Sequence, residues 1–285
     1  MQMSTNFSRF ARNTRVLGNA HRSSQPLNEE HMVRYAPSIF ADGKHESRSE
    51  RYTYVPTIEV LRGLQKEGFQ PFMVAQGNSR IPGKAEFSKH MIRMRHETQA
   101  QQGGEATEII LINSHDGTSS YQMLSGVFRF VCCNGLVVGD IFDTIRIPHK
   151  GNIQDDVIEG AFRVLDTFEK VKDDTAQMKA LTLSREEQGV FADAALTLRF
   201  EDATADKPAP IEASTLNLPR RAEDTGNDLW TTFQRVQENV MQGGQHGRNA
   251  RRQRTTTRPV NSIDRTVQLN RALWTLAEGM RALKA

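Results

Sequence analysis

The chain has 285 residues, of which 37% are hydrophobic and 25% charged, and its formal net charge is only +3. This length suits one large domain or two small ones, and the mild charge excludes a protein that is basic throughout. No apolar run reaches membrane-spanning length and the N-terminus has no apolar signal region, so we predict a cytoplasmic protein without a membrane partner.

Residues 1–50 form a polar, basic N-terminal segment whose first 28 residues contain four arginines and no acid. Two interpretations are open for its beginning, a solvated tail and an arm that contacts DNA. Within the segment, Asn28 can cap a helix and Pro37 can stop it. We therefore predict a short helix over residues 29–35.

An α+β core is predicted over residues 51–200. Pro56 pre-sets a first helical turn, apolar residues then recur at helical spacing, and Gly68 stands where a left-handed cap would fall. Apolar runs bounded by turn residues predict strands after this helix. These strands cover residues 69–76, 87–96 and 108–113.

The segment 121–132 fits two patterns. Its apolar residues fit one face of a helix, but its valines and phenylalanines favour a strand, with Gly126 marking a bulge. We prefer the strand and expect extended structure to continue over 136–147. The chain then becomes helical after Gly151, and Ser184 with Glu187 predicts a capping box for a further helix.

The C-terminal third is predicted to be helical. Residues 201–226 read as a linker or surface excursion because prolines and small residues are frequent there. Residues 227–285 form a helical C-terminal segment with Trp230 and Trp274 in its core, interrupted by an arginine-rich loop at 243–258. Strands first and helices afterwards predict an α+β fold with an antiparallel, strand-rich core followed by packed C-terminal helices.

The arginine-rich loop is the first candidate site. It contains five arginines and no acid, and three threonines follow in a row. Arginine binds phosphate through two parallel hydrogen bonds, and threonine hydroxyls also suit phosphate oxygens. Its glycines predict a mobile loop, and a nucleic-acid contact, a merely solvated loop and a protein or membrane partner all remain open. The candidate residues are Arg248, Arg251, Arg252, Arg254 and Arg258.

A second basic element runs from Lys89 to His96. As a strand it places Lys89, Arg93 and Arg95 on one face, which is typical of a groove that tracks a nucleic-acid backbone or of an ordinary solvent-facing strand. His90 and His96 would lie about 20 Å apart along this strand and could not share one metal ion.

Other residue patterns indicate no chemistry. Ser114, His115 and Asp116 are neighbours, whereas the members of a catalytic triad meet through the fold, so a turn explains them better. Cys132 and Cys133 are adjacent, which strains a disulfide between them. They also lie in an apolar run of the sequence, which disfavours a reactive thiolate. We predict no catalytic residue, no metal and no cofactor.

Three stretches carry a resemblance to a known family: RYTYVPTIEVLRGLQKEGFQPFMVAQ, KHMIRMRH and NSHDGTSSYQMLSGVFRFVCCNGLVVGD. The chain resembles an uncharacterised family of plasmids, phages and prophage-like islands, catalogued as a domain of unknown function (DUF932, the UPF0380 proteins). Members lie beside genes of DNA maintenance and defence and have no agreed catalytic residues. The resemblance implies a mobile-element setting and suggests an analogy with phage annealing proteins, which often form rings.

The sequence therefore predicts a mobile-element protein that binds nucleic acid through phosphates, with little sequence preference. Single-stranded DNA is the expected ligand, with an annealing-like activity and a homo-oligomer as further expectations. The alternatives are an interaction protein that blocks a host factor and an enzyme whose site the sequence does not reveal.

Overall fold

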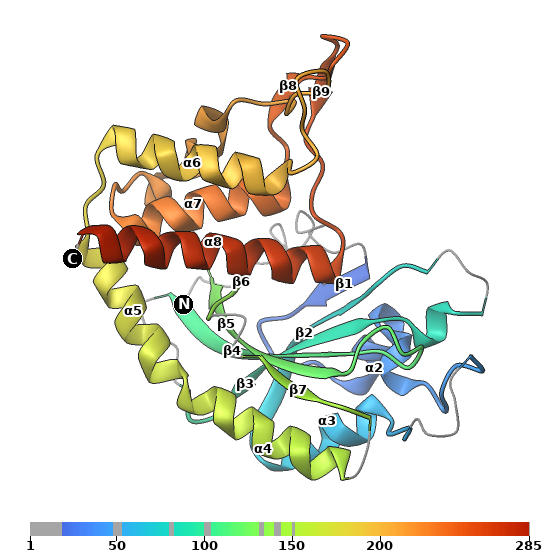
Figure 1. The fold of residues 1–285 in the computed structure, drawn as a ribbon. Coiled ribbons are helices and arrows are strands. Elements are labelled where there is room, and N and C mark those ends of the chain that lie inside the picture. The colour runs from blue at the N-terminus through green and yellow to red at the C-terminus, as the bar shows by residue number, and fades with distance from the viewer. Residues whose placement is uncertain are drawn as a thin grey trace, which may run out of the picture. The chain divides into compact units, whose positions relative to one another are not determined.

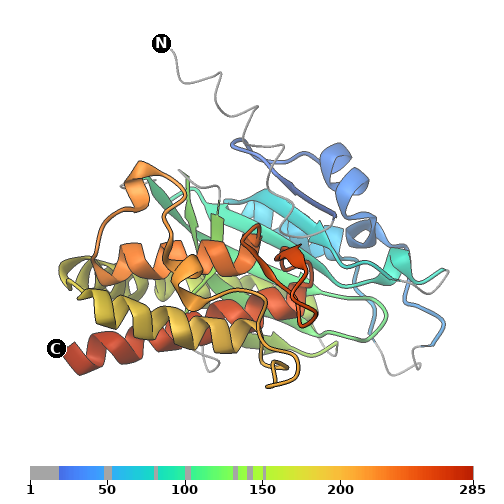
Figure 2. The same cartoon turned by 90° about the horizontal axis from the view of Figure 1, so that it is seen from above.

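The structure is a computed structural model that describes residues 19–47, 53–79, 83–99, 104–130, 134–139, 144–149 and 152–284. The chain divides into an N-terminal unit, residues 1–168, and a C-terminal unit, residues 169–285. Figure 1 and Figure 2 show the elements of both units in two views. The predicted α+β class is confirmed, because an antiparallel sheet precedes a set of packed helices.

An antiparallel sheet organises the N-terminal unit. Within the described residues it has seven strands in the order β1-β2-β3-β4-β5-β6, and β7 also pairs with β5. β6 pairs with one end of β5 and β7 with the other, so these two short strands share an edge. The strands are β1 (Asn19–Arg22), β2 (Phe69–Gln76), β3 (His90–His96), β4 (Glu105–Asn113), β5 (Tyr121–Arg129), β6 (Asn134–Val137) and β7 (Ile145–Ile147).

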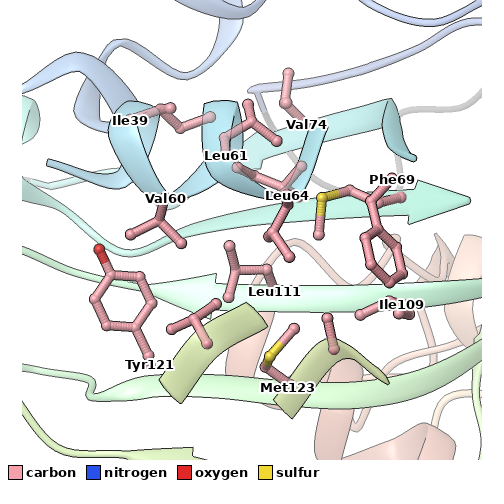
Figure 3. Close-up of a cluster of buried hydrophobic side chains, with 14 of the residues drawn as sticks. Ile39, Val60, Leu61, Leu64, Phe69, Val74, Ile109, Leu111, Tyr121 and Met123 are labelled. Carbon is pink, nitrogen blue, oxygen red and sulfur yellow. The ribbon is translucent and has the colours of Figure 1, made fainter. Parts of the chain in front are cut away.

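Three helices supply the apolar core on one face of the sheet: α2 (Glu29–Tyr35), α3 (Thr57–Lys66) and α4 (Ile153–Asp166). Alternate strand residues point toward these helices, since successive side chains of a strand face opposite sides. Figure 3 shows Leu61 and Leu64 of α3 packing against strand residues such as Leu111. The second face of the sheet carries the other residues of the same strands, among them the charged ones described below.

Several local predictions are confirmed. The helix at 29–35 begins at its expected cap, where the Asn28 side chain accepts a hydrogen bond from the backbone N–H of His31 at 2.9 Å. The strand at 69–76 has the predicted bounds, and 121–129 is a strand and not a helix. Gly68 has the left-handed backbone that its place after α3 predicted, with φ of 87°.

The described part of the N-terminal segment belongs to the fold and is not a tail. β1 pairs with β2, and Leu27, Met32 and Ile39 are buried in the sheet–helix core. The sequence did not predict this, because the segment is mostly polar and only a few of its apolar residues pack into the core. The arginines at positions 9, 12 and 15 lie outside the described residues.

Four helices form the frame of the C-terminal unit: α5 (Phe168–Ala180), α6 (Arg185–Arg199), α7 (Leu229–Gln242) and α8 (Ile263–Lys284). The predicted capping box at the start of α6 is present. Trp230 and Trp274 are buried as predicted and meet edge to face, with ring centroids 6.4 Å apart. Leu283, near the end of α8, is 89% exposed.

The boundary between the units lies earlier than the sequence-based division at residue 200. Helix α6 packs against α7 and α8, where Phe191 contacts Phe233 with ring centroids 6.4 Å apart, so α6 belongs with the C-terminal helices. The excursion at 201–226 is tied to the same helices, since Leu216 is buried and Arg235 of α7 donates to the Asn217 side chain at 3.0 Å.

Candidate functional site

The arginine-rich segment, predicted as a mobile loop, contains a short β-hairpin. β8 (His246–Arg248) pairs with β9 (Arg254–Thr256). The side chain of Asn249 shapes the tip, because its Oδ1 accepts hydrogen bonds from the backbone N–H groups of Arg251 and Gln253, both at 3.0 Å. An asparagine that bonds to backbone a few residues ahead is a standard way of closing a turn.

The base of the hairpin is held by contacts with its surroundings. The backbone of Gly247 passes so close to Pro210 that a Cβ atom at position 247 would lie 1.8 Å from the Pro210 carbonyl oxygen. The Thr257 hydroxyl donates to Gln245 Oε1 at 2.5 Å and is buried. Thr257 is therefore not available as a phosphate donor, which corrects part of the expectation for the three threonines.

All five arginines of the hairpin region are exposed. Within the part of the chain that the structure describes, none of them pairs with a carboxylate. Other arginines of the C-terminal unit do form such pairs: Arg221 with Asp224 and with Glu238, both at 2.6 Å, and Arg265 with Glu201 at 2.9 Å. The hairpin is thus a local excess of positive charge.

Two hairpin arginines face each other across the strands. Arg248 and Arg254 are directly opposite in the register, so their side chains leave the same face of the hairpin. The Arg248 guanidinium donates to the Arg252 carbonyl oxygen at 2.9 Å. Like charges directly opposite in an antiparallel pair destabilise it, so the two guanidiniums form a site of unfavourable repulsion on this face of the hairpin.

The basic strand of the N-terminal unit does not form the predicted groove. Arg93 and Arg95 share a face of β3 as expected, but they are only 3% and 6% exposed. Lys89 is half-buried just before the strand. Neither an open groove nor a solvent-facing strand face exists at Arg93 and Arg95, and their guanidiniums are occupied by partners inside the protein.

Glu108 of β4 is that partner. Its carboxylate accepts from Arg93 at 2.6 Å, from Arg95 at 2.9 Å and from Arg22 of β1 at 3.1 Å. Burial raises the pKa of Glu108, but the three guanidinium charges outweigh it and lower the pKa to about 2. Burial also lowers the pKa of Arg93 to about 10, although Glu108 opposes this change.

Neighbouring residues make room for this buried cluster. A Cβ atom at Gly126 would lie 2.6 Å from an Arg93 nitrogen, so the glycine gives the guanidinium its space and marks no bulge. Arg95 lies over the ring of Phe72, 4.2 Å from its centroid, and Arg22 lies over Phe128 at 4.0 Å. These ring faces offset part of the excess positive charge.

A second buried polar cluster surrounds the hydroxyl of Thr57, at the start of α3. His90 Nε2, Asn113 Nδ2, His115 Nε2 and the Tyr121 hydroxyl lie 2.9, 3.0, 3.1 and 3.4 Å from Thr57 Oγ1. Burial lowers the pKa of His115 to about 4, with His149 adding to this effect and Asp116 opposing it. Burial also lowers the pKa of His90 well below its ordinary value, and the nearby His115 adds to this effect. The cluster stabilises the core through hydrogen bonds.

Replacing Thr57 with valine should lower the free energy of unfolding by about 2 kcal/mol, because several buried groups lose a partner while the side-chain shape is kept. Urea unfolding measures the change. Thr197→Val, at an exposed position of α6, provides the control. An unchanged stability for Thr57→Val would show that the hydroxyl contributes nothing to this cluster.

The neighbouring turn uses its aspartate as the sequence predicted. Asp116 Oδ1 accepts from the Thr118 backbone N–H at 3.0 Å and from the Thr118 hydroxyl at 2.6 Å. His115, in contrast, points into the buried cluster and does not shape the turn through its side chain. No Ser-His-Asp arrangement forms, because Ser114 Oγ accepts from the Ser119 backbone N–H at 2.8 Å and lies within the turn.

Asp116→Ala should lower the free energy of unfolding by about 1 kcal/mol through the loss of these two turn bonds. Thermal unfolding gives the measurement. Asp42→Ala, at an exposed loop position with no hydrogen bond to a turn backbone among the described contacts, is the comparison. A destabilisation no larger than that of Asp42→Ala would contradict the assigned role.

The remaining predictions concern metals, thiols and membranes. Cys132 and Cys133 lie outside the described residues. No group of three or more histidine, cysteine, aspartate or glutamate side chains suited to a metal occurs within the described ranges. None of the helices described has both the length and the apolar composition that crossing a bilayer requires.

The fold, an antiparallel sheet followed along the chain by a set of helices that pack on one another, is that of a protein family whose function is not known. The chain is a member of the family described as "Domain of unknown function (DUF932)", whose model matches residues 44–274. It is 52% identical over 262 residues to UPF0380 protein YafZ of Escherichia coli (strain K12), covering 92% of this chain and 94% of that protein. UPF0380 protein YfjQ of the same organism is 52% identical over 260 residues, covering 91% and 93%. No solved structure matches the chain.

Proposed function

We propose that the protein binds single-stranded nucleic acid through the phosphates, using the arginine hairpin. The opposed pair Arg248 and Arg254 carries the proposal, since it places two exposed guanidiniums on one face without a carboxylate between them. A phosphate that lies between the two side chains would accept from both and cancel their repulsion.

The tip extends this cationic face. Arg251 and Arg252 follow Asn249 at the turn and are exposed, and Arg258 is exposed just beyond the hairpin base. Backbone contacts of this kind carry no sequence information, so we propose binding with little sequence preference. The buried arginines of β3 are left out of this interface because Glu108 occupies them.

The wider setting is also a proposal. The family resemblance supports a protein of plasmids or phages that acts on DNA in the cytoplasm, and an annealing-like activity would need several copies on one strand. We propose single strands because they are flexible. Successive phosphates of a single strand can bend around a short hairpin, whereas a duplex would need a groove that matches its width.

A salt-dependent titration tests the proposal. Fluorescently labelled oligothymidine and a duplex of the same length are titrated with the full chain at several salt concentrations. Binding of the single strand should weaken with salt, with a slope of about −0.7 per phosphate contact. If neither oligonucleotide binds at low salt, the proposed nucleic-acid function is wrong. The alternative is then that the arginines bind a protein partner.

A further inference from the structure

A hollow of about 680 Å³ lies beside the hairpin, within the C-terminal unit. One wall comes from the hairpin, through Asn249, Arg251 and Thr255, and the other from the end of α6 and the segment up to Pro210. Its volume falls within the range of small-molecule sites, which is about 300 to 1,000 Å³. The contact of Gly247 with Pro210 holds the two walls together.

The charges that line the hollow favour an anion. Arg199, Lys207, Arg251 and Arg265 contribute four cationic side chains, against the two acids Glu201 and Asp202. Glu201 pairs with Arg265 at 2.9 Å. Arg199 has no carboxylate partner among the described contacts and donates to the Arg258 carbonyl oxygen at 2.8 Å. Burial lowers the pKa of Arg199, and the nearby positive charge of Arg265 adds to this effect.

The rest of the lining suits a flat, partly apolar ring. Phe200, Pro208 and Pro210 give apolar surface. Asn249, Gln253 and Thr255 supply side-chain donors and acceptors on the hairpin side. An aromatic ring, polar amides and unbalanced guanidiniums in one hollow are the groups that recognise a nucleobase joined to a phosphate.

We propose that this hollow binds one nucleotide, with its base against Phe200 and its phosphate between Arg199 and Arg251. The nucleotide is either free or one unit of a single strand whose neighbouring phosphates lie on the hairpin, and the second case rests on the proposed function. In that case the hairpin supplies the charge attraction and the hollow supplies a stacking contact for one unstacked base.

Two ligands distinguish these sources. Calorimetry measures the binding of thymidine monophosphate, which tests the free nucleotide. Fluorescence anisotropy compares oligothymidine with an oligomer of equal length made only of abasic units, which keeps the phosphates and removes the bases. Stacking on one aromatic ring should make the oligothymidine bind at least about fivefold more tightly than the abasic oligomer.

A charge-matched pair of variants locates the contact. Ala203→Glu places a carboxylate in the hollow, whereas Ala205→Glu adds the same charge to the same exposed segment outside it. Ala203→Glu should weaken nucleotide binding by about tenfold, and Ala205→Glu by less than about twofold. Phe200→Ala should remove the preference for bases, and circular dichroism with thermal unfolding checks that each variant is folded.

The outcomes separate this proposal from the proposed function. If thymidine monophosphate binds and Ala203→Glu weakens this binding, the result supports a nucleotide site in the hollow. This holds even if no oligomer binds and the proposed nucleic-acid function is wrong. Equal affinity for oligothymidine and the abasic oligomer, with no binding of the monophosphate, overturns the hollow while the hairpin function stands. Equal effects of Ala203→Glu and Ala205→Glu on every ligand also overturn it.

Discussion

Replacing Glu108 with glutamine is expected to lower the free energy of unfolding by about 3 to 5 kcal/mol, which is the usual cost of breaking a buried ion pair from one side. Glu108 is fully buried and accepts hydrogen bonds from Arg22, Arg93 and Arg95. Glutamine keeps the size of the side chain but leaves three guanidiniums without a counter-charge. Urea unfolding followed by circular dichroism gives the change.

Glu86→Gln provides the control for this variant, because Glu86 is exposed and should change stability by less than about 0.5 kcal/mol. A loss for Glu108→Gln as small as that of the control would mean that the three arginines do not depend on this carboxylate. Replacing Arg95 and Glu108 together should cost less than the two single losses combined, because the pair is removed as a unit.

The pH dependence follows from the same carboxylate. The pKa of Glu108 is about 2 in the folded protein, against an ordinary value of 4.5. A lowered pKa contributes stability that is fully present above about pH 4.5 and is lost as the pH falls toward about 2. The difference in unfolding free energy between the native protein and Glu108→Gln should therefore shrink over this interval. A difference that is constant with pH would contradict an ionised, paired Glu108.

Replacing Arg251, Arg252 and Arg254 with alanine should weaken the binding of oligothymidine by about a hundredfold at about 0.1 M salt. Each lost phosphate contact to a single strand removes about 0.7 from the slope of log affinity against log salt, so three contacts remove about 2. The loss should be the same for every sequence. Folding should be little affected, because the hydrogen bonds that close the tip come from Asn249 and from backbone groups.

The control for this triple variant removes the same charge elsewhere. Arg163, Lys170 and Arg185 are exposed and lie outside the hairpin, so their alanine variant matches the change in net charge. It should reduce affinity only slightly and leave the salt slope nearly unchanged. Equal losses in the two triple variants would show that overall charge, and not the hairpin, attracts the nucleic acid.

Local signals in the sequence predicted much of the fold. Asn28 and Pro37 bounded α2, the Ser184–Glu187 pair marked the start of α6, and the valines and phenylalanines near Gly126 identified a strand. Each of these signals acts within a few residues of its own position. Strand β1 was missed because its four residues include no apolar run, and its stabilising contacts, with β2 and through Arg22 with Glu108, are made with residues far along the chain.

The candidate site was less predictable because its geometry depends on distant residues. Arg93 and Arg95 alternate along a strand, which is equally consistent with an exposed face and a buried one. Only Glu108, 15 and 13 positions away, decides between them, and a glutamate within the apolar run of β4 was the available signal. The hairpin was not predicted for a similar reason. Its residues show no alternation of apolar and polar side chains, and its contact with Pro210 involves a residue 37 positions before Gly247.

The order of strands in the sheet has a consequence for synthesis of the chain. From β1 to β6 each strand pairs with the one before it, so every new strand emerging from the ribosome finds its partner already made. The sheet can therefore grow in one direction during translation. Arg22 is the exception, since its partner Glu108 follows 86 residues later. The ion pair between the first strand and Glu108 cannot form until the fourth of the seven described strands has been made, so the ion cluster closes midway through synthesis of the sheet.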